Sequence, residues 1–415
     1  MPDALTQRLR ARGLVPPDYD GRGLLNVPAT ALDMLGARQP SDPPVLSDLD
    51  PALRDGVRRV ATVLIDGLGW GQLHALCDDG VTPFLAELRD RARARNSAQL
   101  LEATTVFPST TAAAITTMNT ARTPLEHGNI AYFAWVEEFA QVTQMLRWGA
   151  AITRRGSYFD DATVDPRRYV QVPSIHGRLR ERGIPSFIVE PEIFRTEAMT
   201  RMHAAEASYL GYILPSTMGV RLREFLKGQH GPAYLYAYWA GVDLACHQYG
   251  PGSAEAAAEA ALVDLDLGRA VGDRGPGDTL LLLTADHGHA AVDPDRTIDL
   301  VGDGELAALL RNPLSGEPRL VFLHTDHPDL VREHLEQRWP RTFTLFDRDE
   351  LIAAGLFGRG QGAVTRGRIG EVVAMLTGER SASIVQVDGQ IVRHRGDHGG
   401  MTADEMKIPI LAVRV

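Results

Sequence analysis

The stretch LLLLTADHGH, residues 280–289, indicates the fold class because four leucines lead directly into two ionisable residues, Asp286 and His287. A short, continuous apolar run is typical of a strand buried on both faces, as in a parallel sheet covered by helices. Adjacent ionisable residues at the end of such a strand have no role in packing it. The carboxyl ends of strands in an open α/β sheet converge on one crevice, so we expect a functional site there.

Three further segments also place carboxylates or imidazoles beside apolar runs. They are ATVLIDGLGW (61–70) with Asp66, YAYWAGVDLACHQYG (236–250) with Asp243 and His247, and RGDHGG (395–400) with His398. Carboxylate and imidazole ligands together favour zinc, with manganese or iron as alternatives, because calcium and magnesium sites use oxygen almost alone. Three aspartates and three histidines suit two divalent cations. The sequence therefore predicts a dinuclear metal hydrolase.

Each segment taken alone also has a purely structural explanation. An aspartate that ends a buried strand, such as Asp66, is often a turn residue or helix cap. The D-x-x-x-H spacing of Asp243 and His247 places both on one helix face, which is usually just solvated. Cys246 lies between them, but a buried apolar role is the common one for a free cysteine. The metal hypothesis depends on the conjunction of the segments.

Composition limits the class of protein and of partner. A chain of 415 residues exceeds the usual size of one core, so we expect a large domain carrying a smaller insertion. The net charge of −10 argues against binding a nucleic-acid polymer, whereas a small phosphorylated substrate remains possible because metals supply local positive charge. Two cysteines give no disulfide framework, and no apolar run is long enough to span a membrane. We expect a cytoplasmic protein without membrane association, monomeric by default.

The order of predicted elements indicates an α/β fold with three segments of different character. Residues 1–56 are expected to form an arm on the core, residues 57–293 and 395–415 the catalytic α/β core, and residues 294–394 an inserted α+β cap. Predicted strands of the core are 60–65, 186–189, 233–239 and 279–284, predicted helices are 72–76, 83–93, 218–226 and 254–269, and the cap is expected to hold strands at 320–324 and 384–387 and a helix at 329–338.

A candidate nucleophile lies in FPSTT, residues 107–111. Pro108 and Ser109 form a turn, and Thr110 and Thr111 begin an Ala/Thr-rich helix whose unpaired N–H groups suit an anion. A threonine in this place can be a helix cap and nothing more. Beside a metal pair, a hydroxyl at such a helix N-terminus is what covalent phosphoryl transfer uses.

The ordered series LIDGLGW, FPSTT…EHG, GVDLACHQYG, TADHG and GDHGG…EMKIPIL resembles the alkaline phosphatase superfamily, and within it the nucleotide pyrophosphatase/phosphodiesterase family. The resemblance covers about residues 60–290 and 396–415. It implies an alkaline phosphatase-like core, in which a mixed, largely parallel sheet is flanked by helices and carries two zinc ions at its edge.

The resemblance also implies roles for individual residues. Asp66, Asp286 and His287 would hold one zinc ion beside the nucleophile, and Asp243, His247 and His398 would hold the other. The family's nucleophile lies sixteen residues before the H-G that closes its segment, which from His127 leads to Thr111 rather than Thr110. Thr111 would then be both a ligand of the first zinc and the site of a phosphothreonine intermediate. For His289, a role in orienting a ligand or water and a structural role are both open.

The chain departs from the family pattern where the substrate is recognised. Nucleotide-cleaving members follow the nucleophile with an aromatic residue that stacks on the base, whereas this chain has Ala112. The family's phosphate-binding asparagine corresponds by ungapped count to Tyr132, whose hydroxyl could donate the same hydrogen bond, and Asn129 is a second candidate. We therefore predict cleavage of phosphodiester or pyrophosphate bonds in small molecules, with nucleotide-type substrates possible.

Three alternatives remain open at this stage. A phosphomonoesterase would need an extra cation for the second charge of its substrate. A phosphonoacetate hydrolase-like enzyme would grip a carboxylate with lysines, of which the chain has only Lys227 and Lys407. A catalytically silent protein that binds a phosphorylated ligand is the alternative from another class.

Overall fold

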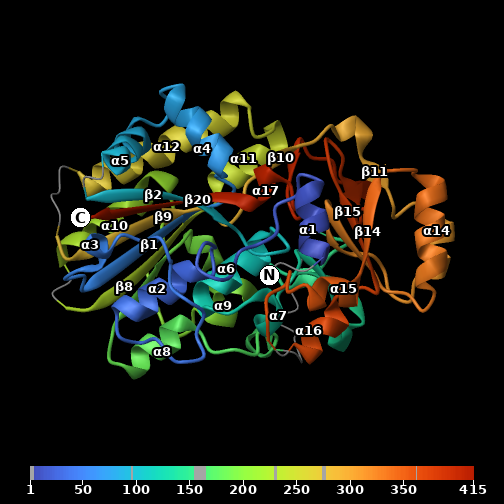
Figure 1. The fold of residues 1–415 in the computed structure, drawn as a ribbon, viewed down its shortest axis with the longest axis horizontal. Coiled ribbons are helices and arrows are strands. Elements are labelled where there is room, and N and C mark those ends of the chain that lie inside the picture. The colour runs from blue at the N-terminus through green and yellow to red at the C-terminus, as the bar shows by residue number, and fades with distance from the viewer. Residues whose placement is uncertain (1–3, 95–96, 154–164, 229–230, 273–276, 361) are drawn as a thin grey trace.

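The computed structural model describes residues 4–94, 97–153, 165–228, 231–272, 277–360 and 362–415, which form two seven-stranded sheets joined by helices (Figure 1). The main sheet is largely parallel, because β20 alone among its strands runs against its neighbours. In spatial order its strands are β2 (Ala98–Thr104), β20 (Lys407–Arg414), β9 (Thr279–Thr284), β1 (Arg59–Ile65), β8 (Ala233–Trp239), β6 (Ser186–Val189) and β7 (Ser208–Tyr209).

The three central strands are the ones that the apolar runs predict. β1 pairs in parallel with β8 on one side and β9 on the other, and every residue of β8 and β9 is buried. Two-sided burial explains why these strands are continuous apolar runs rather than alternating ones. The predicted strands at 60–65, 186–189, 233–239 and 279–284 are thereby confirmed, as is the mixed, helix-flanked α/β fold class.

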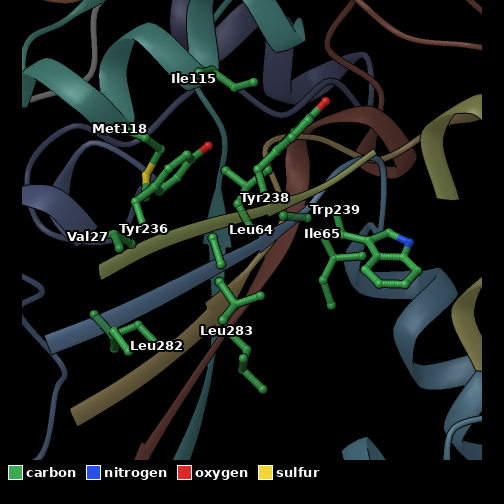
Figure 2. Close-up of a cluster of buried hydrophobic side chains, with 14 of the residues drawn as sticks. Val27, Leu64, Ile65, Ile115, Met118, Tyr236, Tyr238, Trp239, Leu282 and Leu283 are labelled. Atoms are coloured by element: carbon green, nitrogen blue, oxygen red, sulfur yellow. The ribbon is translucent and has the colours of Figure 1, made fainter. Parts of the chain in front are cut away.

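Helices cover both faces of the main sheet (Figure 1). On one face lie α4 (Trp70–Asp78), α5 (Pro83–Arg93), α11 (Gly241–Tyr249) and α12 (Ala254–Val271), and on the other lie α2 (Asn26–Met34), α6 (Thr111–Thr120), α8 (Ile175–Glu181) and α9 (Ala198–His203). Figure 2 shows the core that results, in which Val27 of α2 and Met118 of α6 lie with Leu64, Leu282 and Leu283 of the central strands. Among the described helices, none is long and apolar enough to cross a membrane.

The second sheet is antiparallel and combines distant parts of the chain. In spatial order it contains β14 (Phe343–Asp347), β15 (Val372–Leu376), β13 (Leu320–Leu323), β12 (Ser315–Glu317), β3 (Phe133–Val136), β4 (Gln141–Gln144) and β5 (Gly149–Ala150). Four strands come from the expected cap, 294–394, and three from a segment that the sequence assigned to the core. The predicted helix at 329–338 corresponds to α14 (Pro328–Arg338), but the predicted strand at 384–387 is wrong, because the chain leaves β16 (Ala382–Ser383) before it enters β17 (Gln386–Val387).

Residues 4–56, the described part of the expected N-terminal arm, contact the cores of both sheets. Its first helix, α1 (Ala4–Ala11), contributes Leu5 and Leu9 to the apolar cluster beneath the second sheet. Its second helix, α2, contributes Leu32 to the core of the main sheet. This part of the chain therefore stabilises the arrangement of the two sheets by burying apolar surface against each.

A fully buried ion pair joins the hairpin of the second sheet to the main sheet. Arg319, between β12 and β13, donates from Nε to Glu405 Oε1 at 2.7 Å and from Nη2 to Glu405 Oε2 at 3.2 Å, and neither side chain has exposed surface. Glu405 lies in α17 (Ala403–Met406) immediately before β20, and it also accepts the backbone N–H of Gly400 at 2.9 Å. The pair thus positions the segment that carries His398.

Replacement of Arg319 by methionine should reduce the free energy of unfolding by about 3–5 kcal/mol, because it leaves the Glu405 carboxylate buried without its partner. Urea titration followed by circular dichroism measures the loss. Arg296→Met is the matched control, since its pair with Glu379 is exposed and should contribute about 0–1 kcal/mol. Equal, small effects of the two substitutions would show that the buried pair does not stabilise the fold.

Candidate dinuclear metal site

The candidate metal ligands meet at the carboxyl ends of the parallel strands, at the edge of the main sheet that faces the second sheet (Figure 1). Asp66 follows β1, Asp286 and His287 follow β9, and Asp243 and His247 lie on α11, which follows β8. His398 is brought in by β19 (Gly396–Asp397), which pairs with β10 (Ala290–Ala291) just after the 286–289 segment. The convergence of strand ends therefore assembles residues that are more than 300 positions apart in sequence.

Glycines in two of these segments allow the close approach. Gly67 has φ +76°, and a Cβ at that position would lie 2.9 Å from Nε2 of His289. Gly69 and Gly288 pack backbone against backbone, since a Cβ on Gly69 would lie 2.9 Å from the Cα of Gly288. The D-G-L-G and D-H-G-H patterns are thus explained by the contact between the turns after β1 and β9.

The first ligand group consists of Asp66, Asp286 and His287, all buried. Nε2 of His287 lies 3.3 Å from Asp286 Oδ2 and 3.6 Å from Asp66 Oδ1. The other oxygens of the two aspartates are engaged: Asp286 Oδ1 accepts N–H groups from Gly67 and His287, each at 3.0 Å, and Asp66 Oδ2 accepts the hydroxyl of Tyr238. Oδ1 of Asp66 and Oδ2 of Asp286 have no hydrogen-bond partner among the described residues.

These orphaned oxygens fit a cation. A buried polar atom without a partner is costly, and two carboxylate oxygens beside an imidazole nitrogen form a hard and borderline donor set that zinc accepts. Burial, together with the charges of Asp286 and Asp243, raises the pKa of Asp66 well above its usual range. Within the described residues, all ion pairs of Asp66, Asp243 and Asp286 are with histidines. A bound metal would supply the missing positive charge.

The second ligand group consists of Asp243, His247 and His398. Oδ1 of Asp243 lies 3.4 Å from Nε2 of His247 and 3.7 Å from Nε2 of His398. Burial opposes ionisation of Asp243, but the neighbouring His247 and His289 lower its pKa well below the usual range. Burial disfavours the charged form of His247, but the nearby carboxylate of Asp243 outweighs this effect and raises the pKa of His247 to about 9. Metal binding at His247 Nε2 would therefore release a proton.

The three candidate histidine ligands share one orientation. Nδ1 of His247 lies 2.8 Å from Gly396 O, Nδ1 of His398 lies 2.9 Å from Ser109 O, and Nδ1 of His287 lies 3.2 Å from Gly288 O. A carbonyl oxygen only accepts, so Nδ1 carries the proton in each ring. The Nε2 atom of each ring consequently points toward the aspartates, which is the arrangement found in metal-binding histidines.

The structure distinguishes the two candidate threonines. Thr111, the first residue of α6, places Oγ1 3.1 Å from Nε2 of His287. Thr110 is the residue before the helix, but its side chain does not cap it, and its buried Oγ1 lies beside the carboxyl group of Glu317. Only Thr111 therefore has contact with a candidate ligand of the first group.

Ser109 connects this turn to the second group. Its Oγ donates to Gly400 O at 2.8 Å and accepts the N–H of Gly399 at 3.0 Å, in addition to the bond from its carbonyl to His398. One residue thus fixes the position of His398 relative to Thr111.

The two candidate substrate-binding residues differ in their surroundings. Tyr132 is partly exposed, and its hydroxyl accepts from Nε2 of Gln144, which leaves its own proton available for donation. Asn129 is buried, and its Nδ2 is already directed to Ala112 O at 3.2 Å and Thr116 Oγ1 at 3.0 Å. Of the two side chains, Tyr132 is the one with an uncommitted donor.

The structure places His289, whose role the sequence left open, and adds Asp397, which the sequence analysis missed. His289, left open above, lies with Nε2 2.8 Å from Asp243 Oδ1, and burial lowers its pKa to about 4. Asp397 lies 2.7 Å from Nδ1 of His394, and this pair forms a further group with His247. Because Asp397 directly precedes His398, its place near the site could have been predicted from the sequence.

Glu317 had no such signal. It lies at the end of the three-residue strand β12, and its Oε1 accepts the N–H of Tyr132 at 2.5 Å. It is packed against Gly399, because a Cβ added to Gly399 would lie 2.6 Å from the Cβ of Glu317. Burial raises the pKa of Glu317 to about 8. A further carboxyl group therefore lies next to the segment that carries His398.

Comparison with known proteins agrees with this geometry. The family model of type I phosphodiesterase / nucleotide pyrophosphatase matches residues 60–401. No curated protein matches the sequence significantly.

Solved structures share the fold at low sequence identity. Murine ectonucleotide pyrophosphatase / phosphodiesterase 5 is 16% identical, with a TM-score of 0.60 over 85% of this chain and 87% of that chain. Phosphonoacetate hydrolase from Sinorhizobium meliloti 1021, in complex with phosphonoformate, is also 16% identical, with a TM-score of 0.60 over 86% of this chain and 90% of that chain. These likenesses confirm the predicted alkaline phosphatase-like fold, and the family match covers most of the chain. The chain belongs to the type I phosphodiesterase / nucleotide pyrophosphatase family of phosphoric ester hydrolases.

Proposed function

We propose that the protein hydrolyses phosphodiester or pyrophosphate bonds of small molecules through a covalent phosphothreonine at Thr111, in a site that holds two zinc ions. The observation that carries the proposal is the 3.1 Å contact between Thr111 Oγ1 and His287 Nε2, because it places a helix-terminal hydroxyl against the first ligand group. A nucleophile at the start of α6 also has the unpaired N–H groups of that helix beside it, which suit a phosphoryl group.

The residues that would hold the metals are the two groups described above. Asp66, Asp286, His287 and Thr111 would hold the first, and Asp243, His247 and His398 the second. When bound, two zinc ions supply Lewis-acid stabilisation of the attacking and leaving oxygens. Manganese or iron could occupy the same ligands, since neither carboxylate nor imidazole excludes them.

We infer that the reaction consists of two displacements. Thr111 Oγ1 loses its proton to solvent and attacks phosphorus, so that the Oγ1–P bond forms as the ester or anhydride P–O bond breaks and the departing oxygen is protonated. Water then attacks phosphorus, the Oγ1–P bond breaks, and Thr111 regains a proton. Tyr132, whose hydroxyl proton is uncommitted, would donate to a non-bridging oxygen in both steps.

The charge of the site favours a substrate with one negative charge on the reacting phosphoryl group. Two zinc ions carry four positive charges, which three aspartates and the Thr111 alkoxide would neutralise. Asp397 adds a further carboxylate nearby. A phosphomonoester carries a second negative charge at neutral pH, and this arrangement leaves no positive charge to balance it.

The other candidate functions receive less support. In a phosphonoacetate hydrolase-like reaction a lysine would bind the substrate carboxylate, but Lys407 is paired with Glu102 at 2.8 Å. Ala112 offers no aromatic surface for a nucleobase, although AMP is bound by an inactive form of the murine relative. A silent binding protein would not need Thr111 to contact His287. Cytoplasmic location and a monomeric state stay predictions.

Thr111→Ala should reduce turnover of a phosphodiester by roughly 10³-fold or more, because no hydroxyl remains at that position to attack phosphorus. Metal content, measured by plasma emission on the same samples, should remain about two per chain. Thr110→Ala is the matched control, as it removes the neighbouring hydroxyl that contacts no ligand, and it should retain most activity. Full activity of Thr111→Ala would eliminate this residue as the nucleophile.

Methyl p-nitrophenyl phosphate and p-nitrophenyl phosphate share a leaving group and differ by one charge. The metal-loaded protein should hydrolyse the diester with a kcat/KM at least about tenfold higher, corresponding to about 1.4 kcal/mol in the transition state. Removal of metal with a chelator should abolish both activities, and added zinc should restore them. A preference for the monoester would instead identify a phosphatase, and phosphonoacetate cleavage without ester cleavage would identify the phosphonate alternative.

A further inference from the structure

Three tyrosines alternate along β8, and one of them is directed at a candidate metal ligand. Tyr234, Tyr236 and Tyr238 lie two residues apart, so their side chains share one face of the sheet. All three are buried, but the hydroxyl of Tyr236 has no hydrogen-bond partner among the described residues. The hydroxyl of Tyr238 donates to Oδ2 of Asp66. Figure 2 shows Tyr236 and Tyr238 side by side on this strand.

Because of this contact, the two carboxylate oxygens of Asp66 have different surroundings. Oδ2 is engaged by the phenol, whereas Oδ1 has no partner and lies 3.6 Å from Nε2 of His287. A carboxylate that is held at one oxygen presents the other to a cation in a fixed direction. Asp286 is held in the same manner, because backbone N–H groups engage its Oδ1 and leave Oδ2 unpartnered.

Tyr238 is itself held in place. Its carbonyl oxygen accepts the hydroxyl of Tyr212 at 2.9 Å, and its ring lies 6.3 Å, centroid to centroid, from the ring of Phe194. The backbone N–H of Asp66 is bonded to Trp239 O at 2.8 Å, which fixes the end of β1 against the end of β8. The hydroxyl therefore reaches Asp66 from a rigid support on the neighbouring strand.

We propose that Tyr238 is a positioning residue of the first metal site: by holding Oδ2 of Asp66, it fixes Asp66 as a ligand through Oδ1 and raises the affinity of this site for zinc. The inference rests on the proposed dinuclear function and extends it to a residue outside both ligand groups. Partners that orient a ligand in this way commonly change metal affinity by 10–100-fold when they are removed.

The test is a comparison of Tyr238→Phe with Tyr236→Phe. Each substitution removes one phenolic oxygen from the same face of the same strand, but only the first removes a bond to Asp66. Zinc affinity is measured on metal-depleted full-length protein by competition with a chromogenic chelator. For Tyr238→Phe we expect one of the two zinc ions to bind about 10–100-fold more weakly, while the other keeps wild-type affinity. Tyr236→Phe should bind both ions as the wild type does.

The second zinc ion is an internal control for folding. Wild-type affinity of Tyr238→Phe for both ions would overturn the proposal, and so would an equal weakening at both sites or an equal weakening in Tyr236→Phe, since these results indicate a general packing defect. Wild-type protein that binds two zinc ions and cleaves the diester, with Tyr238→Phe unchanged, would refute the role of Tyr238 alone. Wild-type protein that takes up no zinc would refute the dinuclear function and this proposal with it.

Discussion

Repulsion among three closely spaced aspartates, the buried Asp66 and Asp286 and the partly exposed Asp243, is the constraint on which the site depends. Ligand atoms of Asp66 and Asp286 lie within 4.8 Å of each other. Two unit charges at that separation repel by roughly 3–4 kcal/mol at an effective dielectric constant of 20, before any cost of desolvation is counted. A folded protein keeps such an arrangement only if a positive charge or a proton compensates it. The histidines stabilise the charged form of Asp243, whose pKa is lowered, whereas the pKa of Asp66 is raised.

The surrounding fold fixes the positions of these groups relative to one another. Parallel strands β1, β8 and β9 deliver one ligand segment each, and backbone contacts between glycines bring the turns after β1 and β9 together. Ser109 connects the turn before Thr111 to His398, and the buried pair of Arg319 with Glu405 connects the His398 segment to the second sheet. The positions of Thr111 and His398 therefore depend on contacts that span almost the whole chain.

Much of this could be predicted from the sequence because its signals are local. Continuous apolar runs identified β1, β8 and β9, and the ionisable residues that follow them were the ones that the fold brings together. The two ligand groups have the composition that the family resemblance implied. The choice of Thr111 over Thr110 also came from the sequence, and the contact with His287 is consistent with it.

The remainder required knowledge of which strands are neighbours. Nothing in YLYAYW separates Tyr238 from Tyr234 and Tyr236, because the difference arises only when β1 places Asp66 beside the end of β8. Strands β3 to β5 were assigned to the core because antiparallel pairing with β12 joins segments about 180 residues apart, which no local pattern reports. Glu317 belongs to the same hairpin and was missed for the same reason.

We expect two metal ions to lie between the six ligand residues of the two groups, with Thr111 beside the ion of the first group. Anomalous diffraction at the zinc edge, on crystals of zinc-loaded protein, tests it most directly. The account predicts two peaks, one bounded by Asp66, Asp286 and His287 and the other by Asp243, His247 and His398. A single peak, or a peak bounded by His247, His394 and Asp397 in place of the second, would contradict it.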